Sequence, residues 1–251
     1  MRSRSSRWRD LAEDAALRAL LRAALALPYE RRVPVAGWMA ARLVSPLAGY
    51  GRRVRANLGH VCPELSESEV AQLVRAVPDN LGRSLIEIYS GPEFAARART
   101  MPMTGAGVPA LAQAHEEGRP VLLATGHFGN YDAPRAALLA RGYRVGGLYS
   151  EMRNARFHAH YLRAISAIGT PLFPRTRRGM AQMVRFLRAG GMVGIVADQH
   201  VQGAPYLDFF GKPARTALSA AELALRHEAL LVPIYGIRQP DGLSFQIIAE
   251  A

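Results

Sequence analysis

A histidine and an aspartate five positions apart are the residues of this sequence best suited to chemistry. His127 lies in a loop punctuated by Gly126 and Gly129, and Asp132 follows shortly after. Residues 120–125 predict a buried strand before the loop, and residues 131–141 predict a helix after it. Five positions on one continuous helix turn through about 500°, so the two side chains would then not share a face. With His127 in the loop and Asp132 in the first helical turn, however, the carboxylate can reach the imidazole.

A histidine held by a carboxylate is the usual general base toward a hydroxyl group. The same spacing also fits a loop histidine followed by a helix N-cap carboxylate that has no catalytic role. The strand context favours catalysis, because α/β sheets bind ligands in loops at the carboxyl ends of parallel strands. The chain has no Gly-x-Ser-x-Gly motif, and its single cysteine, Cys62, precedes a proline. The attacking hydroxyl is therefore expected to come from the substrate.

The elements that must position this loop alternate between strands and helices from about residue 119 onward. Beyond those already named, we expect strands over 144–149, 172–173, 192–198, 230–235 and 243–248, and helices over 155–168, 177–189 and 218–227. This alternation predicts the α/β class, with a mixed, mostly parallel sheet covered by helices.

The chain before this region is expected to be helical. Residues 11–43 predict two amphipathic helices split near Pro28 and Pro34, and residues 66–89 predict two helices interrupted at Pro78. Ser66 with Glu69 resembles a capping box.

Positive charge is concentrated in the N-terminal part. The formal net charge is +12, and the first 60 residues hold 12 arginines and 4 acidic residues, which is +8. Such a segment can face anionic lipid, nucleic acid or an acidic protein, or can simply be solvated. Hydrophobic residues make up 49% of the chain and charged residues 21%, a composition that excludes a disordered or collagen-like protein.

Charges interrupt every apolar run, so neither a membrane span, which needs roughly 20 apolar residues, nor a cleavable signal peptide is expected. We interpret residues 1–50 as a basic, amphipathic, helical region that associates with a membrane surface, and residues 51–251 as the catalytic domain. A helical cap on the core is the alternative for the first region. Arginines near the N-terminus favour the cytoplasmic side.

No metal site or cofactor is expected. One cysteine excludes a cysteine-based zinc site. His158 and His160 fall two apart in an expected helix and therefore point to different faces.

Several motifs together resemble the lipid A late acyltransferases, a family within the lysophospholipid acyltransferase superfamily. The resemblance runs from about residue 53 to residue 251. It rests on the His127-x4-Asp132 motif of the superfamily and on blocks more specific to the lipid A branch. These blocks are Arg55-x-Asn57, Pro63-Glu64-Leu65, Gly126-His127-Phe128-Gly129-Asn130, Asp198-Gln199, Asp208-Phe209-Phe210-Gly211-Lys212-Pro213-Ala214, Thr216 and Leu231-Val232-Pro233-Ile234.

The resemblance implies transfer of a fatty acyl chain from an acyl-carrier-protein thioester to a hydroxyl of a lipid A precursor. His127 would be the base and Asp132 its orienting partner. Arg163 is the better match to a family arginine and Arg175 the second candidate. Asp198 matches a later acidic residue, which would support Arg163 or bind the acceptor.

The remaining candidate substrate contacts lie in the matched blocks. Backbone N–H groups near Gly129 or the side chain of Arg163 would stabilise the oxyanion, and Asn130 belongs to the same block. Phe209 and Phe210 would line an acyl tunnel, with plain core as the alternative.

The resemblance also implies the partners and the location. An acyl carrier protein would donate, an anionic lipid would accept, and the enzyme would act at the cytoplasmic face of the bacterial inner membrane, on its surface or weakly anchored. Nucleic acid is not an expected partner, because only 8% of residues are aromatic.

Two departures and two alternatives remain. Asp132 stands where lipid A enzymes often carry glutamate, and the family's C-terminal helical segment is expected to be absent. A lysophosphatidate or glycerolipid acyltransferase is the first alternative function. A non-catalytic basic protein that binds membranes is the second.

Overall fold

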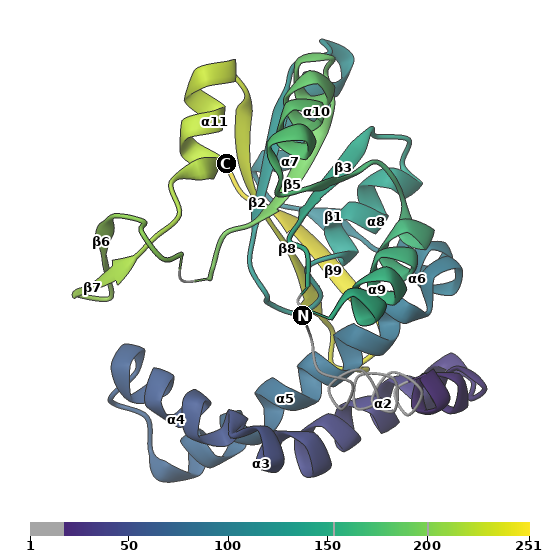
Figure 1. The fold of residues 1–251 in the computed structure, drawn as a ribbon, viewed down its shortest axis with the longest axis vertical. Helices are drawn as coiled ribbons and strands as arrows, with labels where there is room; N and C mark the ends of the chain where they lie inside the picture. The colour runs from purple at the N-terminus through teal and green to yellow at the C-terminus, as the bar shows by residue number, and fades with distance from the viewer. Residues whose placement is uncertain (1–17, 153, 200) are drawn as a thin grey trace, which may run out of the picture. The chain divides into compact units, whose positions relative to one another are not determined.

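The structure is a computed structural model that describes residues 18–152, 154–199 and 201–251 (Figure 1). The chain forms two compact units that divide between Ser90 and Gly91. The boundary expected at residue 50 therefore falls inside the first unit. The arginines expected before the first helix, and the start of that helix, lie outside the described residues.

The first unit is helical, as expected. Residues 18–25 are helical, and they are followed by α2 (Tyr29–Met39), the π-helical turn η1 (Ala40–Val44), α3 (Ser45–Ala48), α4 (Tyr50–Val61) and α5 (Glu67–Tyr89). The predicted break near Pro28 is confirmed, because Pro28 is the N-cap of α2. The predicted capping box is also present, since Ser66 and Glu69 each bind the other's backbone N–H at the start of α5.

The predicted helix breaks at Pro34 and Pro78 are wrong, because each proline lies inside a continuous helix. An interior proline costs a helix about 3 kcal/mol or more. Tight packing of α2 against α5 opposes this cost: a Cβ added to Gly82 would lie 2.5 Å from the carbonyl oxygen of Ala36. Tertiary packing thus outweighs the local preference.

The second unit is built on a seven-stranded sheet. Its strands are β1 (Met103–Thr104), β2 (Val121–Thr125), β3 (Val145–Tyr149), β4 (Leu172–Pro174), β5 (Met192–Val196), β8 (Leu230–Arg238) and β9 (Phe245–Ala249). Their order is β1-β9-β8-β2-β5-β3-β4, and only the β8–β9 pair is antiparallel among these described strands. The expected mixed, mostly parallel sheet is confirmed.

Helices lie on both sides of this sheet (Figure 1). They are α6 (Gly91–Ala98), α7 (Gly107–Glu116), α8 (Ala133–Ala140), α9 (Ala155–Ile168), α10 (Arg177–Arg188) and α11 (Ser219–His227). Met183 and Leu187 of α10 pack with Val193 of β5 and Ala224 of α11 in one buried cluster. Helix α8 packs against β3, β8 and β9, and α6 contacts α8 and α9. The α/β class is thus confirmed, although α6 and α7 were not predicted.

Two short strands lie outside the main sheet. β6 (Tyr206–Phe209) and β7 (Lys212–Arg215) pair with each other as an antiparallel hairpin, seen at the left of Figure 1. The sequence predicts that the strand before this hairpin runs from residue 192 to residue 198. The strand ends at Val196, so Asp198 lies in a loop.

Along the described parts of the chain, no helix combines the length and the hydrophobicity that a bilayer crossing requires.

Candidate active site

The register of two neighbouring strands brings His127 and Asp198 together. β2 and β5 are parallel, and their last residues, Thr125 and Val196, are paired. His127 and Asp198 each lie two positions beyond these strand ends. Because parallel neighbours end at the same edge of a sheet, the two side chains emerge side by side.

Asp198 binds His127 through both carboxylate oxygens. The ring nitrogen Nδ1 of His127 lies 2.8 Å from Oδ1, and the backbone N–H of His127 donates to Oδ2 at 2.6 Å. Burial opposes ionisation of Asp198, but its hydrogen bonds to His127 outweigh this effect and lower the pKa of the carboxyl group. An ionised carboxylate only accepts hydrogen bonds, so Nδ1 carries the proton. In the neutral imidazole the lone pair is then on Nε2, which is the nitrogen a general base requires.

Gln199 and Gly126 frame this pair. The side-chain nitrogen of Gln199 lies 3.5 Å from Nε2 of His127. A Cβ added to Gly126 would lie 3.0 Å from Oδ2 of Asp198. The absence of a side chain at Gly126 therefore gives the carboxylate room to approach the loop backbone.

Asp132 has a different partner from the one expected. It is the N-cap residue of α8, and its two carboxylate oxygens accept from Nε and the terminal nitrogen Nη2 of Arg135 at 2.6 and 2.8 Å. Both side chains are 8% exposed. The expectation that Asp132 holds the His127 ring is thus corrected in its geometry: the carboxylate on the ring belongs to Asp198. The reason is the N-cap position, from which Asp132 reaches the guanidinium one turn along.

Arg135 links Asp132 to helix α9. Its terminal nitrogens donate to the carbonyl oxygens of Gly169 and Ile165 at 2.7 and 2.9 Å. Burial alone would lower the pKa of Arg135, but the charge of Asp132 outweighs it and the pKa is raised. Asp132 and Arg135 therefore form a bidentate, charge-assisted pair that is also hydrogen-bonded to the end of α9.

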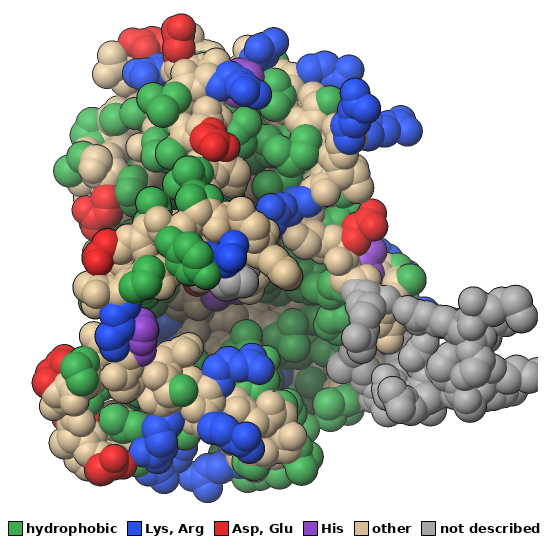
Figure 2. Space-filling model, turned by 60° about the vertical axis from the view of Figure 1, so that its left-hand side comes forward, with side chains coloured by type: hydrophobic (Ala, Val, Ile, Leu, Met, Phe, Trp, Pro, Cys, Tyr) green, Lys and Arg blue, Asp and Glu red, His purple; other side chains and the backbone are tan. Residues whose placement is uncertain are grey.

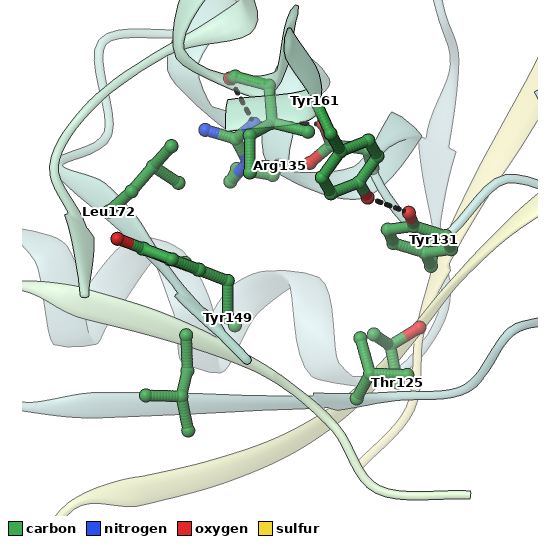
Figure 3. Close-up of a pocket in the computed structure, with 12 residues that line it drawn as sticks. Thr125, Tyr131, Arg135, Tyr149, Tyr161 and Leu172 are labelled. Carbon is green, nitrogen blue, oxygen red and sulfur yellow. Dashed lines mark hydrogen bonds and ion pairs between the residues drawn. The ribbon is translucent and has the colours of Figure 1, made fainter. Parts of the chain in front are cut away.

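A pair of tyrosines completes the wall beside His127. The hydroxyl groups of Tyr131 and Tyr161 are hydrogen-bonded to each other, and Figure 3 shows them pointing toward one another next to Arg135. Burial raises the pKa of both phenols. The ring of Tyr131 also makes an edge contact with His127, with centroids 5.2 Å apart. Both phenols are therefore neutral, and their rings offer an apolar wall.

The loop itself is fixed by backbone contacts. Gly129 has a φ of +55°, and a Cβ there would lie 1.9 Å from the carbonyl oxygen of Gly236. The backbone N–H of Asn130 donates to that same oxygen at 3.2 Å. The side-chain oxygen of Asn130 accepts from the backbone N–H of Asp132. Asn130 is fully buried. The structure thus gives Gly129 and Asn130 a role in holding the loop.

His127 opens onto a pocket with a volume of about 350 Å³. A smaller cavity of about 90 Å³ adjoins it, because Tyr131, Leu148, Tyr149, Tyr161 and Val196 line both. The inner cavity is also lined by Ile165, Leu172 and two strand glycines, Gly147 and Gly194. Figure 3 shows this inner part, bounded by side chains from β2, β3, β4, α8 and α9. His127 thus lies at the mouth of an outer pocket of mixed polarity, and a largely apolar inner cavity adjoins that pocket.

The comparison with protein families decides the classification. The model of the bacterial lipid A biosynthesis acyltransferases matches residues 3–251 of this chain. The chain belongs to this family. It is therefore an acyltransferase, and the resemblance inferred from the motifs is confirmed.

Two curated relatives support an acyltransferase. The phosphatidylinositol mannoside acyltransferases of two Mycobacterium tuberculosis strains (CDC 1551 / Oshkosh and ATCC 25618 / H37Rv) are each 25% identical to it over 233 residues. Each match covers 84% of this chain and 74% of the relative.

The two predicted arginines of this acyltransferase lie in different places. Arg175 lines the same pocket as His127, and its backbone N–H donates to the carbonyl oxygen of Tyr149. Arg163 is exposed on α9, where its Nε donates to the carbonyl oxygen of Ala159. The geometry therefore brings Arg175, and not Arg163, to the pocket of His127.

Phe209 and Phe210 lie on the β6–β7 hairpin with 50% and 64% of their surface exposed. The lining of the two cavities is made by other residues. Sequence reasoning missed Arg135, Tyr131 and Tyr161. A signal existed for Arg135, which stands alone in the otherwise apolar helix sequence Ala-Pro-Arg-Ala-Ala-Leu-Leu-Ala.

Proposed function

We propose that this protein transfers a fatty acyl chain from an acyl-carrier-protein thioester to a hydroxyl group of a lipid A precursor, with His127 as the general base. The observation that carries the proposal is the bond between Asp198 and Nδ1 of His127 at the mouth of the pocket. Lipid A as the product class is supported by the family match over residues 3–251.

The reaction proceeds by direct transfer. Nε2 of His127 takes the proton of the acceptor hydroxyl while its oxygen attacks the thioester carbonyl carbon, and the carbonyl oxygen becomes an oxyanion. When this intermediate collapses, the carbon–sulfur bond breaks and the thiolate takes the proton from Nε2. Asp198 keeps the imidazole in the required tautomer and stabilises the imidazolium that forms in between. Gln199, 3.5 Å from Nε2, is positioned to donate to an oxygen in this space.

The acyl chain occupies the pocket and the adjoining inner cavity. Leu148 and Val196 line both spaces, and Ile165 lies deeper. The Asp132–Arg135 pair closes on itself and fixes α8 against the end of α9. In this proposal Asp132 acts on the shape of the pocket through Arg135.

Arginines bind the anionic partners. Arg175 in the pocket is positioned to hold a phosphate of the acceptor, since a guanidinium group forms bidentate hydrogen bonds to two phosphate oxygens. Arg163 stays a predicted contact for the same partner. The net charge of +12 favours encounter with an acidic carrier protein.

The enzyme works at the cytoplasmic face of the bacterial inner membrane in this proposal. Four large apolar side chains in η1 and the two helices next to it support membrane association of the first unit, because about half or more of their surface is exposed. They are Trp38, Leu43, Val44 and Leu47.

A second acceptor is favoured by the mycobacterial relatives, whose name specifies phosphatidylinositol mannoside. An acceptor of this kind also combines a phosphate with hydroxyl groups, so the same base and the same Arg175 would serve it. Acceptor competition separates the two: turnover of the glycolipid or of lysophosphatidate without turnover of a lipid A precursor would assign the protein to glycerolipid acylation.

The test is an acyl-transfer assay with an acyl-carrier-protein thioester and a tetra-acylated lipid A precursor. His127→Ala should abolish transfer while its circular dichroism spectrum stays unchanged. His115→Ala, at an exposed histidine on α7, is the matched control and should retain activity. Equal transfer by wild type and His127→Ala would exclude His127 as the base.

A further inference from the structure

The β6–β7 hairpin exposes an unusual amount of apolar surface. Tyr206, Leu207, Phe209 and Phe210 are 61%, 44%, 50% and 64% exposed. Scattered single apolar residues are normal at a protein surface, but adjacent large ones mark a site of interaction. The hairpin therefore offers a contact surface rather than part of the core.

The tip of the hairpin is a defined turn that holds the aromatic side chains in place. Phe209 pairs with Lys212 across it, and Phe210 and Gly211 both have positive φ angles, +53° and +73°. A positive φ is uncommon for a bulky residue and needs support from its surroundings. Oδ1 of Asp208 supplies it by accepting from the N–H of Gly211 at 3.2 Å.

Cationic side chains accompany the apolar ones. Lys212 stands beside the turn, and Arg215 lies over the ring of Tyr206 at 4.7 Å while donating to its hydroxyl. Figure 2, turned to bring this side of the molecule forward, shows hydrophobic side chains at the surface with lysine and arginine side chains among them. Aromatic residues next to lysine and arginine are the composition of segments that lie in a membrane interface.

The hairpin is also tied to the pocket at both of its ends. Gln199 and Val201 precede it, Ala217 and Ser219 follow it, and all four line the pocket of His127. The segments on either side of the hairpin therefore form part of the pocket wall.

We propose that the β6–β7 hairpin is a membrane-insertion element: Phe209 and Phe210 enter the acyl region of the bilayer surface, and Lys212 and Arg215 contact anionic lipid head groups. This element would present the pocket to lipids directly. It acts in addition to any contact made by the N-terminal region, and it does not depend on which lipid is the acceptor.

A lipid surface fits the hairpin better than a protein partner does. An acidic carrier protein would be recognised mainly by cations, yet four large apolar side chains dominate this surface. Removal of both phenylalanine rings should weaken binding to anionic vesicles about tenfold or more, because each ring is already about half buried in the protein and its further burial in lipid contributes roughly a threefold factor or more.

The experiment places an environment-sensitive fluorophore on a cysteine at position 210 of the full-length chain, in the variant Cys62→Ser/Phe210→Cys. The control is Cys62→Ser/Leu225→Cys, because Leu225 is 83% exposed on α11. With vesicles of phosphatidylethanolamine and phosphatidylglycerol, the label at 210 should shift to the blue and be quenched by spin-labelled lipids, whereas the label at 225 should not. A label at 210 that stays in water, or equal shifts at both positions, would overturn the proposal.

Sedimentation with the same vesicles gives the second readout. Phe209→Ser/Phe210→Ser should bind them about tenfold more weakly, and Leu225→Ser should bind like wild type. A double variant that binds vesicles normally but loses binding of the acyl carrier protein, or of a second copy of the chain, would assign the hairpin to that partner instead. His127→Ala should insert normally, so a failure of the acyl-transfer proposal is distinguishable from a failure of insertion.

Discussion

Asp198 lies 71 positions beyond His127 in the sequence, yet its Oδ1 is 2.8 Å from Nδ1 of the imidazole. The paired ends of β2 and β5, Thr125 and Val196, produce this closeness. The carboxylate that is nearer to His127 in the sequence, that of Asp132, is bound to Arg135 instead. The two aspartates therefore have separable roles, one on the imidazole and one within the fold.

The substitution Asp198→Asn should reduce kcat by about a hundredfold or more, because an amide neither fixes the tautomer nor stabilises the imidazolium. The melting temperature should fall only modestly, by about 2–4 °C for each kcal/mol of stability lost, since the Asp198 side chain is 44% exposed. Steady-state kinetics with the acyl-carrier-protein thioester, beside a thermal melt, checks both. Unchanged kcat would remove Asp198 from the catalytic machinery.

The matched substitution Asp132→Asn should act on stability first. It leaves Arg135 as a buried cation without its counter-ion, and breaking such a pair costs about 3–5 kcal/mol. Urea unfolding measures the free energy change. A large loss of kcat with the free energy of unfolding unchanged would point the other way, to a direct action of Asp132 on His127.

Local sequence patterns predict one part of the site and not the other. The strand–loop–helix around His127 follows from hydrophobic runs and two glycines, which is why the loop histidine and the α/β class could be predicted. The partner of His127 could not, because it depends on β5, and not β3, lying next to β2. Strand order is set by long-range packing, which no local pattern records.

Phe209 and Phe210 show the same limit at the surface. The sequence predicts for both a place in the wall of an acyl tunnel or in the core, but the hairpin strands pair with each other, and all four residues of β6 and Phe210 are exposed. Hydrophobic residues are usually inside, yet the rule does not identify the exceptions. The exceptions here are what motivates the proposed insertion into a lipid surface.

Acid should weaken the contribution of Asp198 to folding. Its pKa is lower in the folded chain than the ordinary value of about 3.9. For a lowered pKa, the stabilisation is complete above the ordinary value and is lost as the pH falls through the folded value. The difference in unfolding free energy between wild type and Asp198→Asn should therefore shrink as the pH falls from about 5 to 3. Urea unfolding at several pH values checks this; a constant difference would contradict it.

Activity with the carrier-protein donor should fall steeply as salt is added. At low salt, a basic enzyme attracts an acidic carrier protein over a long distance. At about 0.15 M salt, this attraction is screened beyond roughly 8 Å. The value of kcat/KM should decline with ionic strength, whereas kcat at saturating donor should change little. A salt series with sodium chloride measures both, and a flat response of kcat/KM would remove electrostatic docking of the donor.

The depth of the inner cavity should set the preferred acyl chain length, and Gly194 is the position that controls it. Gly194 lines this cavity of about 90 Å³, and a Cβ added there would meet only the carbonyl oxygen of Gly146 within 4 Å, at 3.8 Å. Gly194→Val should therefore fold normally and fill the space with methyl groups. Each methylene of the acyl chain that no longer fits into the cavity loses about 0.8 kcal/mol of burial free energy, close to a fourfold change in kcat/KM.

The measurement is kcat/KM for a series of acyl-carrier-protein thioesters that differ by two carbons. Gly194→Val should move the maximum toward shorter chains, and Gly194→Ala should move it less. Val193→Ala is the control, because Val193 belongs to the core cluster on the opposite face of β5. It should lower stability without moving the maximum. If all three variants keep the wild-type chain preference, the acyl chain does not reach this cavity, since a filled cavity cannot accommodate the same chain end.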